Sequence, residues 1–162
     1  MVRRLVLVLA VALALPGVAA ANTSHEGWPK INGDLKMHKN DESGTLRATK
    51  TRKHNELLGG HGNDTIVAGR VGDVIWGDYK PGGQPTSQRD LLYGGPGRDF
   101  IYASHGTNDI SAGGGDDVVH AHFGSGTIDC GAGTDTAFVS HRSRKGYRIR
   151  HCERISYKTL GH

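Results

Sequence analysis

The chain has 162 residues, of which 25 are glycine and 22% are charged, with a formal net charge of +4. Charge is unevenly distributed: residues 59–139 contain ten Asp and four basic residues, whereas residues 140–162 contain seven basic residues and one Glu. The middle of the chain should therefore attract cations, the tail could meet an anionic surface, and no nucleic acid partner is expected.

Residues 1–21 have the layout of a secretory signal peptide. Arg3 and Arg4 precede an apolar stretch from Leu5 to Leu15, small residues follow, and cleavage is expected after Ala21. A membrane anchor would need a longer apolar span than the one that ends before Pro16. The sequence predicts a secreted or cell-surface protein with no transmembrane span in its mature chain, and residues 22–50 are expected to form a covering or capping segment.

Eight units, seven of them nine residues long, make up most of the region 51–139. The third unit has seventeen residues, eight more than the others, and the half-unit "HNELL" precedes the series. Glycines at the start of each unit permit positive φ and let backbone carbonyls converge. One apolar residue at a fixed position predicts a short strand with one inward side chain. Position eight of the units holds Ile66, Ile75, Leu92, Ile101, Ile110, Val119, Ile128 and Ala137.

The units resemble the haemolysin-type (RTX-like) calcium-binding nonapeptide repeat, G-G-x-G-x-D-x-U-x, over about residues 50 to 139. The resemblance implies an all-β fold, a parallel β-roll. This is a right-handed β-solenoid with two nonapeptide repeats per coil and short capping segments. It also implies that Ca²⁺ sits between turns stacked on the same edge, where each six-residue turn supplies an Asp carboxylate and backbone carbonyls.

With two units per coil, alternate turns stack on the same edge of the roll. We call the first the glycine-rich edge; its position-six residues are Asn55, Asp73, Asp99, Asp117 and Asp135. The second edge carries Asp64, Asp90, Asn108 and Gly126 at position six, and it also receives the eight-residue insertion. Calcium takes six to eight oxygen ligands, so a turn without Asp should bind it weakly or not at all.

We therefore predict calcium ions in the 73/99, 99/117 and 117/135 gaps, and one at most between Asp64 and Asp90. Stacked carboxylates would repel one another by ~3 kcal/mol per pair at an effective dielectric near 20, and glycine-rich backbone is costly to order. The calcium-free repeats should then be largely unfolded, unless the aliphatic column and the caps hold the roll together. The further predicted ligands are the backbone carbonyls of Gly95, Gly97, Gly113 and Gly115.

The outer face of one sheet should carry an aromatic column. Position nine there holds Trp76, Tyr102, His120 and Phe138, and Phe100 is at position seven. An apolar face of this kind is rarely left bare. We favour cover by the N-terminal segment with "HEGWPKI" or by the insertion. The alternative is an interface for self-association or ligand binding made by Trp76, Phe100, Tyr102 and Phe138.

The basic tail, residues 140–162, alternates apolar and basic residues around Ile149 and Ile155. This pattern predicts a closing strand or hairpin that caps the roll. Cys130 and Cys152 are an even pair in a chain predicted to be exported, so we expect them to form a disulfide.

No motif for catalysis is present: GxSxG, HExxH and the P-loop are all missing from the sequence. The ten histidines lack Cys or carboxylate partners at metal spacing. We predict a protein that is not an enzyme: an exported calcium-binding β-roll with a structural or cell-surface role. One alternative is a calcium-dependent adhesion or self-assembly module, with contact to a cell wall or surface. A weaker alternative is an ice-binding roll, which would need a regular ladder of side chains that position five does not show.

Overall fold

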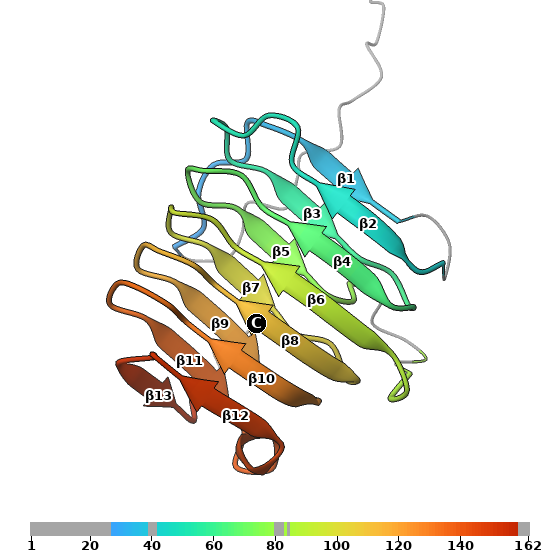
Figure 1. Cartoon of the computed structure of the whole chain (residues 1–162), viewed down its shortest axis with the longest axis vertical. Helices are drawn as coiled ribbons and strands as arrows, with labels where there is room; N and C mark the ends of the chain where they lie inside the picture. The colour runs from blue at the N-terminus through green and yellow to red at the C-terminus, as the bar shows by residue number, and fades with distance from the viewer. Residues whose placement is uncertain (1–26, 39–41, 80–82, 84, 159–162) are drawn as a thin grey trace, which may run out of the picture.

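The computed structural model describes residues 27–38, 42–79, 83 and 85–158. The predicted signal peptide lies outside these residues. The described chain folds into an all-β solenoid of about six turns, with two parallel sheets facing each other (Figure 1). No helix in this part of the chain is long and apolar enough to span a membrane.

Successive strands alternate between the two sheets. The seven-stranded sheet contains β1 (Leu35–Met37), β3 (Glu56–Leu58), β5 (Val74–Trp76), β7 (Phe100–Tyr102), β9 (Val118–Ala121), β11 (Thr136–Val139) and β13 (Arg154–Ser156). The six-stranded sheet contains β2 (Gly44–Arg47), β4 (Asp64–Val67), β6 (Arg89–Tyr93), β8 (Thr107–Ser111), β10 (Ser125–Asp129) and β12 (Tyr147–Arg150). A 3-10 turn, η1 (Ser143–Lys145), precedes β12.

The register of the strands confirms two nonapeptides per coil. Phe100 pairs with Val118 and Val118 with Thr136, a step of 18 residues each time. Val74 pairs with Phe100, a step of 26 residues, so the insertion adds eight residues to one connection and leaves the pairing in register.

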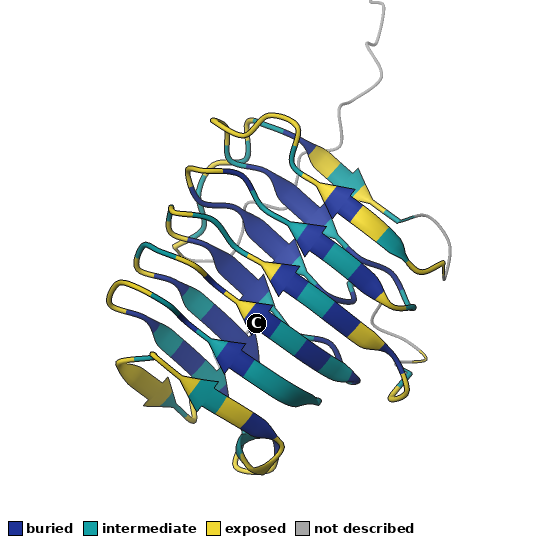
Figure 2. Ribbon diagram, viewed as in Figure 1, coloured by how far each residue is buried: buried dark blue, intermediate teal, exposed yellow. Residues whose placement is uncertain are grey.

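The core is a column of aliphatic side chains between the sheets. Every position-eight residue of the repeats is buried, and Leu46 and Leu57 extend the column toward the N-terminus. Figure 2 shows the buried positions alternating with less buried ones along the strands of the front sheet. Full burial of one Leu or Ile side chain stabilises a fold by roughly 1.5–3 kcal/mol. The roll therefore has a continuous apolar core that runs along the stack of coils.

The solenoid is longer than the repeat region that the sequence predicts. Strands β1 and β2 lie in the predicted covering segment but pair in parallel with β3 and β4. Strands β12 and β13 likewise add one more coil by pairing in parallel with β10 and β11. This parallel pairing excludes the hairpin alternative for the tail, because the strands of a hairpin are antiparallel.

The disulfide joins Cys130 to Cys152, with 5.2 Å between their Cα atoms. It links the turn that follows β10 to the segment between β12 and β13. The last coil is thus fastened covalently to the coil before it.

Candidate metal centre

The position-six side chains of the glycine-rich edge form one ladder inside the roll. Asp73 N–H donates to Asp99 Oδ1 (2.6 Å), and Asp99 N–H donates to Asp117 Oδ1 (2.8 Å). Asp117 N–H donates to Asp135 Oδ1 at 2.7 Å. Each carboxylate therefore holds the backbone of the coil before it, and its own orientation is fixed by that bond.

The ladder continues at both ends through residues that the repeat pattern missed. Asp34 N–H donates to Asn55 Oδ1 (2.7 Å), and Asp135 N–H donates to Glu153 Oε2 (2.7 Å). Glu153 follows Asp135 by the regular 18 residues, so that spacing could have identified it. Asp34 precedes Asn55 by 21 residues, and no spacing rule would have found it.

The second carboxylate oxygen distinguishes the turns of this edge. Asp73 Oδ2 accepts a hydrogen bond from Gly69 N–H, and Asp99 Oδ2 accepts one from Gly95 N–H (2.6 Å). Within the described chain, Asp117 Oδ2 and Asp135 Oδ2 are buried and have no hydrogen-bond partner. Burying an anionic oxygen without a hydrogen-bond donor costs free energy. A proton or a cation in the 117/135 gap would remove this cost.

Glycine conformation explains this difference. The turns 112–117 and 130–135 have a glycine with positive φ at both position two and position four. In turn 68–73 position four is Val71, and in turn 94–99 Pro96 separates two glycines that do not have positive φ. In turn 112–117 the position-two N–H donates to Cys130 O (3.2 Å), and no bond to Asp117 Oδ2 forms. The glycines with positive φ in these two turns are Gly113, Gly115, Gly131 and Gly133.

The four backbone carbonyls predicted as ligands all lie against glycines of the next coil. A Cβ at Gly131 would come within 3.0 Å of Gly113 O, and one at Gly133 within 3.0 Å of Gly115 O. A Cβ at Gly113 would likewise come within 3.0 Å of Gly95 O, and one at Gly115 within 3.0 Å of Gly97 O. Only glycine leaves room for this column of oxygens, which runs along the edge beside the carboxylates.

The electrostatics of the gap also favour a cation. Burial, together with the neighbouring carboxylates of Asp99 and Asp135, raises the pKa of Asp117 to about 8. Burial raises the pKa of Asp99 to about 7 and also raises the pKa of Asp135. Among the described residues, no three His, Cys, Asp or Glu side chains converge to hold a metal ion. A site here would have to combine carboxylates with backbone carbonyls, which is a ligand set that Ca²⁺ accepts.

The Asp64–Asp90 gap on the second edge is more fully satisfied by protein groups. Asp64 N–H donates to Asp90 Oδ1 (3.0 Å), and Asp90 Oδ2 accepts from the Ser104 hydroxyl (2.7 Å). Asp64 Oδ2 accepts from Gly60 N–H (3.0 Å), and Asp64 Oδ1 lies 2.8 Å from His38 Nδ1. Every oxygen of this pair has a partner, so the gap fits a metal ion less well than the 117/135 gap does.

The aromatic column stacks on the outer face of the seven-stranded sheet. Ring centroids are 4.1 Å apart for Trp76 and Tyr102, 4.6 Å for Tyr102 and His120, and 5.0 Å for His120 and Phe138. Trp28 from the N-terminal segment packs edge-on against Trp76 and Tyr102, and its Nε1–H donates to the Tyr102 hydroxyl (2.8 Å). Trp28 of the N-terminal segment thus lies on this face.

Phe100 is not available as part of an exposed interface. Its side chain is only 4% exposed, because Arg98 stacks over the ring at 4.9 Å and a Cβ at Gly27 would lie 3.7 Å from it. An interface on this face would therefore have to use Phe100 through a change in the groups that cover it, and its part in such an interface stays a prediction.

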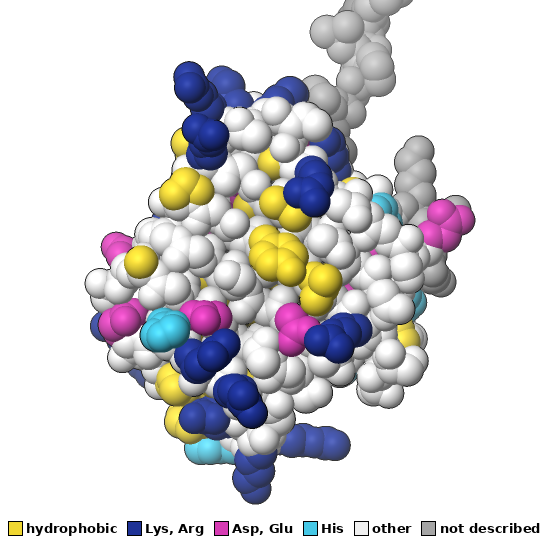
Figure 3. Space-filling view, viewed as in Figure 1, with side chains coloured by type: hydrophobic (Ala, Val, Ile, Leu, Met, Phe, Trp, Pro, Cys, Tyr) yellow, Lys and Arg dark blue, Asp and Glu magenta, His cyan; other side chains and the backbone are white. Residues whose placement is uncertain are grey.

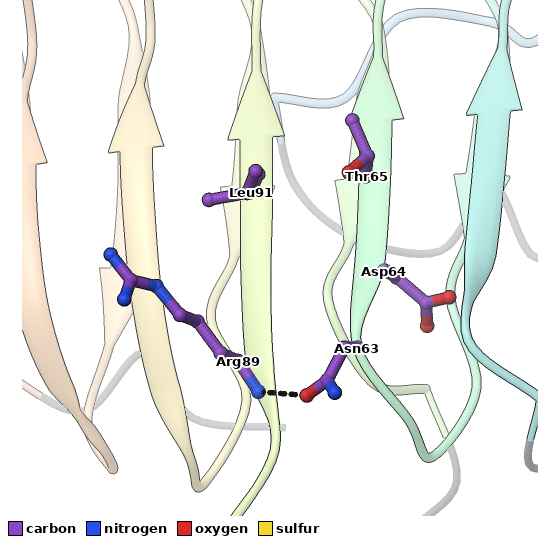
Figure 4. Close-up of a pocket in the computed structure, with 5 residues that line it drawn as sticks. All are labelled: Asn63, Asp64, Thr65, Arg89 and Leu91. Carbon is purple, nitrogen blue, oxygen red and sulfur yellow. Dashed lines mark hydrogen bonds between the residues drawn. The ribbon is translucent and has the colours of Figure 1, made fainter.

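The opposite face belongs to the six-stranded sheet. In Figure 3 it shows hydrophobic side chains near its centre, acidic and basic side chains beside them, and Lys and Arg side chains toward both ends of the stack. A shallow pocket of about 380 Å³ lies on this sheet, where Arg89 N–H donates to Asn63 Oδ1 at 2.6 Å (Figure 4). Its lining residues are Asn63, Asp64, Thr65, Arg89 and Leu91.

The fold and the edge geometry define a parallel β-roll whose glycine turns stack buried carboxylates beside backbone carbonyls. The chain matches the family model of the RTX calcium-binding nonapeptide repeat in four copies, over residues 51–75, 86–119 and 106–137. The matched segments are RTX calcium-binding nonapeptide repeats, and these repeats and the solenoid fit a calcium-binding β-roll. No match was found among curated proteins or among solved structures.

Proposed function

We propose that the protein is an exported β-roll that binds Ca²⁺ on its glycine-rich edge and serves a structural or cell-surface role. The observation that carries the proposal is the pair of buried oxygens Asp117 Oδ2 and Asp135 Oδ2, which lack donors among the described residues. A divalent cation between the two turns would neutralise both carboxylates.

The protein's contribution is to hold the ligands in place. The ladder bonds to Asp117 Oδ1 and Asp135 Oδ1 keep both carboxylates from turning away. The glycines of the two turns let the carbonyls of Gly113 and Gly115 approach the same edge. These four groups are the proposed protein ligands of the 117/135 gap, and calcium would supply the positive charge that the buried carboxylates lack.

The 73/99 and 99/117 gaps are proposed as weaker sites. Asp73 Oδ2 and Asp99 Oδ2 already accept backbone N–H bonds, so a metal ion would have to displace them or share the oxygens. We therefore expect Ca²⁺ to occupy the 117/135 gap at a lower calcium concentration than the other two gaps.

The proposed export is supported by the leader-like residues 1–21 and by the disulfide, since disulfides persist in oxidising compartments. Self-association through the aromatic column has less support, because Trp28 occupies that face.

The test is a calorimetric calcium titration of the chain from residue 22 onward, with Mg²⁺ as the metal control. We expect binding of Ca²⁺ and little binding of Mg²⁺, because Mg²⁺ demands a stricter octahedral geometry. Asp117→Asn should weaken the first calcium site at least about tenfold, since it removes a charged ligand. Asp116→Asn is the matched control, because Asp116 is exposed and its acceptor bond to Thr134 N–H survives the change. Absence of calcium binding, or equal weakening by the two variants, would refute the proposal.

A further inference from the structure

We infer that the side-chain amides of Asn55 and Asn108 take the place of calcium in their turns, so that only the C-terminal part of the glycine-rich edge responds to the metal. The inference rests on the proposed calcium binding. It assigns a metal-free role to the two position-six residues that are Asn instead of Asp.

Asn55 bridges the groups that a cation in its gap would bridge. It is fully buried, and its Nδ2 lies 2.8 Å from Asp73 Oδ1, 2.7 Å from Lys53 O and 3.3 Å from Lys50 O. These are the carboxylate of the next coil and two carbonyls of its own turn. Its Oδ1 keeps the ladder bond with Asp34 N–H.

Asn108 makes the equivalent arrangement on the second edge. Its Nδ2 lies 3.1 Å from Ser104 O and 3.4 Å from Gly106 O, which are carbonyls of its own turn. The same nitrogen lies 3.1 Å from the Tyr147 hydroxyl, which donates to Phe123 O at 3.0 Å. The next turn of this edge has Gly126 at position six and so offers no carboxylate. Asn108 Nδ2 donates to the hydroxyl of Tyr147 in β12 instead.

The N-terminal end of the ladder carries its own positive charges. Asp34 Oδ2 accepts hydrogen bonds from the N–H and the hydroxyl of Thr49 and from Lys50 N–H. The ammonium groups of Lys36 and Lys50 lie 3.5 Å and 3.8 Å from its carboxylate oxygens. Both oxygens of this carboxylate therefore have a protein donor or cation beside them, unlike Asp117 Oδ2 and Asp135 Oδ2, which have no hydrogen-bond partner among the described residues.

These contacts divide the roll into two regions. An amide NH₂ supplies two donors without a charge that must be balanced, so a turn closed by Asn needs no ion. Turns 50–55 and 103–108 should hold their shape at any calcium concentration. Turns 112–117 and 130–135, which have the unpartnered carboxylate oxygens, should become ordered only when calcium binds.

Amide hydrogen–deuterium exchange of the mature chain in EDTA and in calcium tests this division directly. Calcium should slow exchange at least about tenfold in turns 112–117 and 130–135 and by less than about twofold in turns 50–55 and 103–108. Equal slowing in all four turns would overturn the inference while leaving calcium binding intact. No slowing in any turn would overturn calcium binding as well.

The variant Asn108→Asp replaces the amide by a carboxylate without a change in size. In EDTA its thermal midpoint should be lower than that of the unmodified chain by at least about 4 °C, because the NH₂ donors to the turn are lost. Asn63→Asp is the matched control: it makes the same chemical change at an exposed position of the same edge and keeps the acceptor for Arg89 N–H. Equal midpoints for the two variants would overturn the inference, and if Asn108→Asp does not fold, the exchange experiment on the unmodified chain decides.

Discussion

At the scale of single residues, the glycines decide which turns can become metal sites. Asp is present at position six in most turns, yet two of the carboxylates on the glycine-rich edge are satisfied by a nearby N–H and two are not. The difference goes with positive φ at positions two and four. In turn 68–73 position four is β-branched Val71, which disfavours positive φ, and in turn 94–99 neither Gly95 nor Gly97 has positive φ.

Gly133→Ala tests this role of glycine. Gly133 has φ +149°, and a Cβ there would come within 3.0 Å of Gly115 O. We expect the free energy of unfolding in calcium to fall by about 1–3 kcal/mol, measured by urea denaturation, together with weaker calcium binding.

Gly114→Ala is the matched control for this variant. Gly114 does not have positive φ, and a Cβ would meet no atom nearer than Ala132 O at 3.7 Å. It should be neutral or stabilise the protein by up to about 1 kcal/mol. If both alanine variants cost the same, glycine conformation is not what shapes the turns.

At the scale of strands and turns, sequence reasoning reached the repeat units, the coil length and the inward apolar column, because these follow from a fixed spacing. It did not reach β1 and β2, and for the tail it predicted a strand or hairpin around Ile149 and Ile155 without the parallel pairing by which β12 and β13 extend the roll. The turns that lead into these strands lack the glycine motif and are closed instead by individual contacts, such as those of Asp34 with Thr49 and of Tyr147 with Asn108. The sequence also could not distinguish the calcium gaps, because the partner of each Oδ2 depends on the backbone angles of the turn.

The N-terminal segment acts on the aromatic column as a fixed cover, and Trp28→Ala tests this. Removing the indole ring takes away two ring contacts and the hydrogen bond to Tyr102. We expect a loss of roughly 2–4 kcal/mol in the free energy of unfolding and an increase in binding of an apolar dye. Dimers that form only in this variant would show that the uncovered column can self-associate.

Trp28→Phe separates packing from hydrogen bonding at the same position. It keeps an aromatic ring on the column but removes the Nε1–H donor, so it should lose only about 1 kcal/mol. An unchanged free energy of unfolding in Trp28→Ala would mean that the segment does not cover the face in solution.

At the scale of the whole molecule, a stack of buried carboxylates makes the stability of the metal-free protein depend on pH. In the folded chain the pKa of Asp90 and that of Asp99 are about 7, and that of Asp117 is about 8, all raised by burial. In the unfolded chain an Asp has a pKa of about 3.9. Between these values the folded state binds more protons than the unfolded state, so stability falls as the pH rises.

We therefore expect the thermal midpoint in EDTA to be higher at pH 5 than at pH 8. In saturating calcium the difference should shrink or reverse, because the metal takes the place of the protons and competes with them less at high pH. Scanning calorimetry at both pH values, with and without calcium, measures this. Asp117→Asn should flatten the EDTA slope strongly, and Asp116→Asn should flatten it less, because the Asp116 charge is only a smaller cause of the raised pKa of Asp117. A midpoint in EDTA that rises from pH 5 to pH 8 would contradict the account, because the buried carboxylates would then be stabilised as anions by the protein alone and calcium would have no charge to neutralise.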